Sequence, residues 1–187
     1  MAKSAEYFDF KFNKKSAEKL IAEELLQVNA PARIRLLLNF KGKLELQSFS
    51  LQKTGWGTDP VKIKLSKQHT SSDDIFLQHK TTRREFYNEH FHKAVEEGYD
   101  EVIFTNERGE ISEGAISNIF IQMQDGSWYT SPLNSGLLPG IWRGQTIKKL
   151  NASEKVLFPA DLEKAKQIII GNSVRGGIRA VISCVGD

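Results

Sequence analysis

Apolar and polar residues follow two different periodicities in the first part of the chain. In residues 16–28 the apolar side chains recur on one face of a helix, and lysine and glutamate occupy the other face. This is typical of an amphipathic helix that packs on a core. Residues 32–38 and 44–49 alternate instead, and Gly42 lies between them. The pattern predicts one helix followed by a β-hairpin whose turn contains Gly42.

A longer mixture of strands and helices follows the segment 55–60, which is rich in turn-forming residues. The expected strands are residues 61–65, 74–78, 101–105, 117–122, 127–130, 154–158, 167–171 and 178–183, and the expected helices are 83–97, 139–150 and 160–166. The chain is therefore predicted to be α+β. We place a smaller part with its linker at residues 1–59 and a larger part at residues 60–187.

Composition narrows the classes of protein to consider. The 26 basic and 23 acidic residues are scattered along the chain and give a formal charge of +3, so no nucleic-acid partner is expected. No apolar run approaches the roughly 18 to 20 residues that span a bilayer, and no signal peptide is visible. We expect a cytoplasmic protein with no membrane partner. Cys184 is the only cysteine, which predicts no disulfide, no metal site and a small, partly buried side chain.

Two segments carry residues suited to a carbonyl cofactor with a ring nitrogen. Lys80 follows the apolar run 75–77, so a strand end would present its amine at the rim of a sheet. Glu113 precedes a small-residue turn, and a carboxylate opposite a pyridine nitrogen keeps that nitrogen protonated. Ser117 and Asn118 are hydrogen-bonding residues where the next strand begins. Taken singly, a solvated lysine and a turn carboxylate remain the ordinary interpretations.

Two further segments are suited to phosphate and carboxylate groups. In residues 135–145 the amides of Ile141 and Trp142 open a predicted helix, and Leu138 could pack on a flat ring. In residues 168–177 the strand breaks at Asn172 and Ser173, which suit a phosphate, and Arg175 suits a carboxylate. A good helix start and a surface arginine are the alternative interpretations.

The order and spacing of HKTTRREFY, ISEGAISNIF, LLPGIWR and GNSVRG resemble the fold-type IV pyridoxal-phosphate enzymes from about Phe12 onward. The resemblance implies a D-amino-acid aminotransferase-like fold, with the large domain and a remnant of the small one. It implies a covalent bond between Lys80 and pyridoxal 5′-phosphate. It also implies a homodimer, with Tyr87 and Phe91 near the contact. The cofactor-binding residues that it implies are Lys80, Glu113, Ser117, Asn118, Leu138, Gly140, Ile141, Trp142, Asn172 and Ser173.

Within that family, HKTT followed by Arg84 is most similar to 4-amino-4-deoxychorismate lyase. Branched-chain transaminases place a tyrosine five residues after the lysine, where this chain has Glu85, and Tyr87 stands two positions later. The lyase would make 4-aminobenzoate and pyruvate, with Arg84 and Arg175 binding substrate carboxylates. An aminotransferase of branched-chain or D-amino acids is the first alternative, and a non-catalytic remnant of the family is the second.

The N-terminal segment departs from the family pattern. Family members carry a segment like HLxRLxxSA, whose arginine clamps the phosphate, and the match here begins at MAKSA. Residues 2–10 also have the pattern of the end of a helix without an upstream cap. We therefore expect the chain to be truncated.

Overall fold

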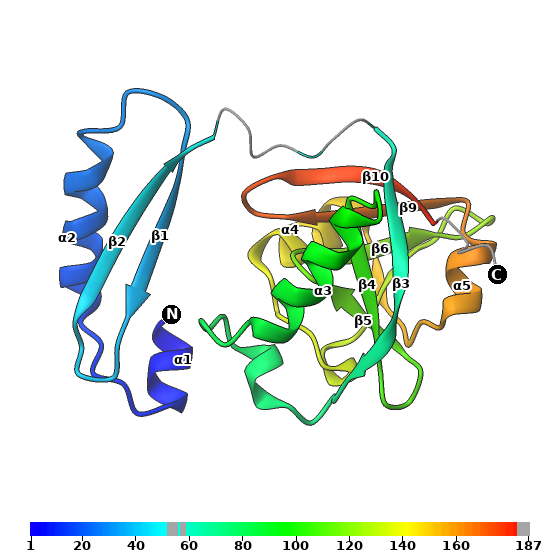
Figure 1. The fold of residues 1–187 in the computed structure, drawn as a ribbon, viewed down its shortest axis with the longest axis horizontal. Helices are drawn as coiled ribbons and strands as arrows, with labels where there is room; N and C mark the ends of the chain where they lie inside the picture. The colour runs from blue at the N-terminus through cyan, green and yellow to red at the C-terminus, as the bar shows by residue number, and fades with distance from the viewer. Residues whose placement is uncertain (52–55, 57–58, 183–187) are drawn as a thin grey trace. The chain divides into compact units, whose positions relative to one another are not determined.

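The computed structural model describes residues 1–51, 56 and 59–182. The chain forms two compact units, Met1–Gly55 and Trp56–Asp187, which are drawn in Figure 1. Cys184 and half of the segment 55–60 lie outside the described residues. In the part of the chain that is described, no helix has the length and apolar content to cross a membrane.

The first unit contains two helices and a β-hairpin. Its elements are α1 (Ala2–Tyr7), α2 (Lys14–Leu25), β1 (Ala32–Leu38) and β2 (Leu44–Ser50). Asn13 caps α2 by accepting a hydrogen bond from the Ser16 amide at 3.0 Å. The strands are antiparallel, and the turn needs Gly42 at φ +89°. The predicted helix and hairpin are confirmed, with the helix shifted by two or three residues at its ends.

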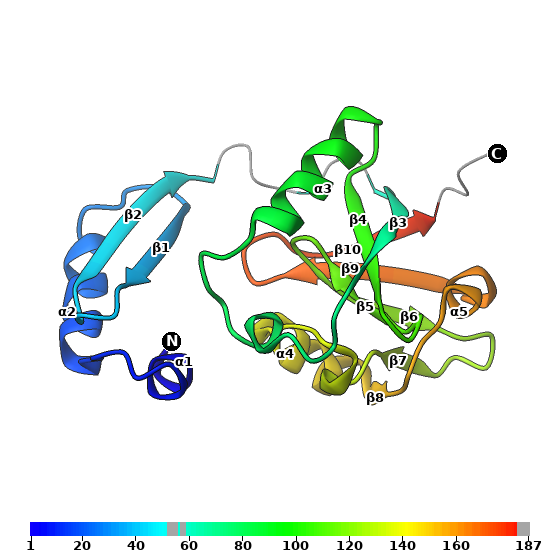
Figure 2. The same cartoon turned by 60° about the horizontal axis from the view of Figure 1, so that its bottom comes forward.

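The second unit is built on an eight-stranded sheet in the order β5-β4-β3-β10-β9-β6-β7-β8. Strand β3 runs parallel to β4 and β10, and β10, β9 and β6 are successively antiparallel. Helices α3 and α4 lie on opposite sides of β9 and β10 in Figure 2. The bounds are β3 (Val61–Thr70), α3 (Glu85–Glu96), β4 (Glu101–Asn106), β5 (Ile111–Gly114), β6 (Asn118–Gln122), β7 (Trp128–Thr130), α4 (Ile141–Leu150), β8 (Ser153–Glu154), α5 (Pro159–Lys164), β9 (Gln167–Asn172) and β10 (Gly176–Ile182).

Strand β4 divides the core because it is buried on both faces. Ile103 belongs to the larger cluster, to which β3, β6 and β9 contribute most of the other strand residues. Val102 and Phe104 point the other way, into a second cluster under α3. Tyr87 and Phe91 of α3 pack in or against this second cluster, so core packing accounts for both rings.

Three of the predicted strands are wrong in type or extent. Residues 75–78 form the 3-10 helix η1 (Ile75–Gln78), because the Asp74 side chain accepts a hydrogen bond from the Phe76 amide and turns the chain. Strand β3 continues to Thr70, beyond its predicted end. Only Ser153 and Glu154 of the region around 154–158 pair in the sheet, and Leu157 is buried there without being in a strand. Short apolar runs suit a strand and a buried turn equally.

Candidate functional site

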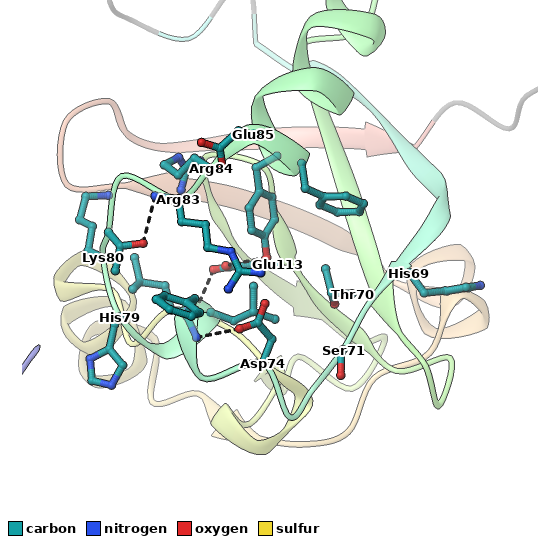
Figure 3. Close-up of a pocket in the computed structure, with 16 residues that line it drawn as sticks. His69, Thr70, Ser71, Asp74, His79, Lys80, Arg83, Arg84, Glu85 and Glu113 are labelled. Atoms are coloured by element: carbon teal, nitrogen blue, oxygen red, sulfur yellow. Dashed lines mark hydrogen bonds between the residues drawn. The ribbon is translucent and has the colours of Figure 1, made fainter. Parts of the chain in front are cut away.

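A cavity of about 410 Å³ opens in the second unit, within the usual range of roughly 300 to 1,000 Å³ for ligand pockets. It lies between the end of β3, η1 and the first turn of α3. Figure 3 shows Lys80 and His79 on one side of the cavity and His69, Thr70 and Ser71 on the other. Four residues predicted from the sequence line it, namely Lys80, Arg84, Glu113 and Leu138.

Lys80 reaches the cavity from a loop, so its predicted place at a strand end is wrong. The loop follows η1, which the Asp74 cap begins. The segment before η1 is fixed at Ser72, whose amide and hydroxyl donate to the Glu107 carboxylate at 2.7 and 2.6 Å. A Cβ on Gly136 would lie 2.7 Å from the Ser72 Cα, so the segment before Leu138 packs closely on the segment before Lys80. These contacts hold together the two segments that lead to Lys80 and to Leu138 in the cavity lining.

Glu113 is a buried carboxylate in β5 with three neutral donors. Its Oε2 accepts from the Asn118 side-chain amide at 3.2 Å and from the Leu138 backbone amide at 3.1 Å. Burial raises the pKa of Glu113 to about 7, although the Leu138 bond and the positive charges of Arg84 and Lys80 act to lower it. A cation placed against such a carboxyl group would stabilise its ionised form.

Tyr87 supports the same carboxylate. Its hydroxyl donates to Glu113 Oε1 at 3.3 Å, and its ring packs edge-on against Phe104 with centroids 5.1 Å apart. Burial, and next the negative charge of Glu113, raise the pKa of Tyr87, so the phenol stays a donor. Reasoning from the sequence compared Tyr87 with the family's tyrosine and placed it near a dimer contact, and it missed this contact with Glu113. A buried tyrosine normally needs a hydrogen-bond partner, and that was the available signal.

A second group of predicted residues surrounds the start of α4, outside the cavity lining. Gly140 caps this helix, and the Trp142 amide donates to Ser173 Oγ at 3.2 Å. Asn172 donates to the Ile116 carbonyl at 2.9 Å. Ile141 is largely exposed. Backbone amides at a helix start beside a hydroxyl group make a binding site for an anion such as phosphate.

Asn118 joins this group to the cavity. Its side-chain amide donates to both the Glu113 carboxylate and the Leu138 carbonyl. A Cβ on Gly140 would lie 2.4 Å from Asn118 Oδ1, so the start of α4 rests directly on this side chain. The carboxylate and the helix start are therefore held by one residue.

Two predicted residues have partners elsewhere. Ser117 is buried and its hydroxyl donates to the Glu101 carboxylate at 2.7 Å, while neither residue lines the cavity. The Arg175 guanidinium lies over the Trp56 ring, 5.1 Å from its centroid. Arg84, in contrast, lines the cavity, donates to the Ala115 carbonyl and lies over the Tyr87 ring.

The donor set fits pyridoxal phosphate. Lys80 offers an amine for a carbonyl, Glu113 offers a buried carboxylate for a ring nitrogen, and Leu138 offers an apolar side chain for a flat ring. The start of α4 with Ser173 offers donors for a phosphate. The carbonyl, the ring nitrogen and the phosphate of the cofactor thus each have a chemical counterpart.

Trp142 depends on two glycines of the β9–β10 hairpin. A Cβ on Gly171 would lie 2.4 Å from the Trp142 ring, and one on Gly177 would lie 2.8 Å from it. We expect Gly171→Ala to lower the free energy of unfolding by about 1–3 kcal/mol, because the ring and the start of α4 must shift. Gly144→Ala is the control, since that position in α4 is open and should gain about 0.5–1 kcal/mol. Urea titration measures both, and equal stability of the two variants would contradict this packing argument.

Comparison with known proteins identifies the family. The model of amino-transferase class IV matches residues 1–182, so the chain belongs to that family, whose members depend on pyridoxal phosphate. A solved protein from Mesorhizobium loti, provisionally named an amino-acid aminotransferase, is 30% identical, with a TM-score of 0.89 over 97% of this chain and 87% of that one. The expected α+β fold of the D-amino-acid aminotransferase type is confirmed.

Relatives with two different activities are similar to this chain. The branched-chain-amino-acid aminotransferase of Escherichia coli (strain K12) is 35% identical over an alignment of 86 residues that covers 43% of this chain and 28% of that protein. A structure from Legionella pneumophila, provisionally named a 4-amino-4-deoxychorismate lyase, has a TM-score of 0.83 at 19% identity, covering 97% of this chain and 74% of that one. The latter likeness establishes the fold alone.

Proposed function

We propose that this chain is a pyridoxal-phosphate lyase that converts 4-amino-4-deoxychorismate to 4-aminobenzoate and pyruvate. The observation that carries the proposal is the cavity, whose lining contains Lys80 and Glu113 together with Arg83 and Arg84. Arginine is suited to carboxylates because its fork of donors matches their two oxygens. The proposed substrate bears two carboxylates, whereas the side chain of a branched-chain amino acid bears none.

Each residue has a defined task in this proposal. Glu113 keeps a negative charge against the ring nitrogen, and Tyr87 and Asn118 hold that carboxylate in place. Ser173 and the amides of α4 bind the phosphate. Arg175, which lies over the Trp56 ring and outside the cavity lining, stays a proposed additional contact for a substrate carboxylate.

The Lys80 amine carries the proton transfer. It removes the proton from the substrate carbon that bears the amino group. Bound pyridoxal phosphate would supply a ring that delocalises the electron pair left on that carbon. That electron pair would then form the new ring double bond while the bond between the ring carbon and the enolpyruvyl oxygen breaks, so the ring would become aromatic. The leaving enolpyruvate would take up a proton, for which the protonated Lys80 is the donor, and become pyruvate. Arg84 orients the substrate through a carboxylate throughout.

Residues 60–187 form the cofactor-binding domain in this proposal, and residues 1–59 represent part of a smaller domain with its linker. We also propose a homodimer, as the family resemblance implies. Because Tyr87 is buried in the second core cluster and Phe91 packs against it, a dimer contact near α3 would mainly use more exposed residues of that helix. Phe86 and Val95, which are partly exposed, are the apolar candidates.

An aminotransferase is the second candidate, supported by the relatives from Escherichia coli and Mesorhizobium loti. The two reactions use the same lysine and differ in what leaves the site. A transaminase needs a keto acid to take the amino group, and the lyase needs none.

The deciding experiment supplies each substrate separately to the chain with pyridoxal phosphate. We expect pyruvate from 4-amino-4-deoxychorismate without a keto acid, measured by coupling to lactate dehydrogenase. Transfer of the amino group from leucine to 2-oxoglutarate, without pyruvate from the chorismate derivative, would establish the second candidate instead. Absence of both activities in a chain that binds the cofactor would favour the non-catalytic alternative.

A further inference from the structure

Glu101, the first residue of β4, is fully buried, although no step of the proposed reaction uses it. Its Oε1 accepts from the amides of Val102 at 2.9 Å and Ala115 at 3.1 Å. Its Oε2 accepts from the Ile116 amide at 3.1 Å and from the Ser117 hydroxyl at 2.7 Å. Three of these four donors belong to the turn that joins β5 to β6.

That turn connects two residues of the cofactor site. Glu113 lies immediately before residues 114–117, and Asn118 lies immediately after them. The two side chains are hydrogen-bonded to each other across the turn. A Cβ on Gly114 would lie 2.8 Å from Glu101 Oε2 and 2.4 Å from Ser117 Oγ, so the turn is wrapped tightly around the Glu101 carboxylate.

The structure assigns Glu101 as a positioning residue of the cofactor site, which fixes the 114–117 turn and thereby holds Glu113 toward the ring nitrogen. The assignment rests on the proposed binding of pyridoxal phosphate. Glu101 itself is not expected to touch cofactor or substrate, because it does not line the cavity.

The number of donors explains why this position needs a carboxylate. A carboxylate has two acceptor oxygens and can take all four bonds, whereas a glutamine has one oxygen and one amide group. If the amide group replaces Oε2, the Ile116 amide loses its acceptor. If the amide group replaces Oε1, the Val102 amide loses its acceptor. The Ala115 amide still has one, because it also donates to the Val102 carbonyl at 3.0 Å. Either orientation leaves a buried amide unpaired, at an expected cost of about 1–3 kcal/mol.

A double-mutant cycle for pyridoxal-phosphate affinity separates positioning from general stability. We expect Glu101→Gln to weaken binding about tenfold, because a released turn no longer orients Glu113. If Glu101 acts through Glu113, the double variant with Glu113→Gln should bind within about twofold of Glu113→Gln alone. Effects that multiply in the double variant would overturn the assignment. Ser112→Ala is the matched control, since it removes a buried hydrogen bond to the Phe104 carbonyl one residue from Glu113 and should leave affinity unchanged.

Amide hydrogen exchange without cofactor tests the same assignment independently. We expect Glu101→Gln to accelerate exchange at Val102 or Ile116 at least about tenfold, with Ile169 and Ile170 of β9 unaffected. Uniform acceleration, or none, would overturn the hold of Glu101 on the turn. If the wild-type chain fails to bind pyridoxal phosphate, the proposed function fails and the positioning role with it, whereas local acceleration alone would still establish the hold on the turn.

Discussion

Replacing Lys80 with alanine should abolish both the covalent attachment of pyridoxal phosphate and the reaction. Among the described residues that line the cavity, Lys80 is the only lysine, and its positive charge acts to lower the pKa of Glu113. No other lysine of this described lining is therefore placed to substitute for it. Loss of a general base alone costs roughly 10²–10⁴ in rate, and loss of the covalent link adds to that. Borohydride reduction followed by peptide mapping measures the attachment directly.

Lys67→Ala is the control for this experiment, because Lys67 is an exposed residue of the same unit, in β3. It should retain attachment and full activity. A small primary amine such as methylamine, added at high concentration, should restore part of the proton transfer to the Lys80→Ala chain. A borohydride-labelled peptide centred on a different lysine would refute the assignment of Lys80.

The parts of the fold that were predictable from the sequence are those with a long periodic pattern. Residues 14–25 and the β1–β2 hairpin repeat their pattern over several turns or residue pairs, so few alternatives compete. Residues 75–77 gave an apolar run too short to distinguish a strand from η1. There the hydrogen bond from the Phe76 amide to the Asp74 side chain favours the 3-10 helix, and the sequence gives only a weak signal for this local bond.

The residues of the candidate site also differ in how far the sequence predicts them. Lys80, Glu113 and Leu138 were predicted as site residues from short motifs, and the structure brings all three to the lining of one cavity. Glu101 was missed because its task depends on a turn 14 to 16 residues away. That contact exists only once β4 pairs with β5, and the pairing cannot be seen in either segment alone.

Glu113→Gln should leave the site folded while removing most of its activity. The substitution fits the local hydrogen bonds, because the glutamine oxygen can accept from Asn118 and Leu138 while its amide group donates to the Tyr87 oxygen. What disappears is the negative charge that the proposed function places opposite the ring nitrogen. A charged hydrogen bond contributes about 1.5–3 kcal/mol, so the rate should fall roughly ten- to 150-fold.

The same substitution should make the chain without cofactor more stable at high pH. Burial raises the pKa of Glu113 to about 7 from an ordinary value of 4.5. Folding therefore favours the protonated carboxyl group, and its contribution to stability is lost as the pH rises from about 4.5 through 7. Each pKa unit corresponds to about 1.4 kcal/mol, so ionised Glu113 costs roughly 3 kcal/mol above pH 7. Glutamine carries no charge and avoids this cost.

Urea titrations at pH 5 and pH 8 check this sign against the activity of the same two proteins. The Glu113→Gln chain should resemble the wild type at pH 5 and exceed it at pH 8. A smaller decline with rising pH should persist in the variant, because burial raises the pKa of Glu101 to about 7 as well. A variant that is both less stable at pH 8 and less active would show that the carboxylate supports the fold. We expect greater stability together with lower activity. In the proposed function the buried charge of Glu113 serves the cofactor and costs the fold stability.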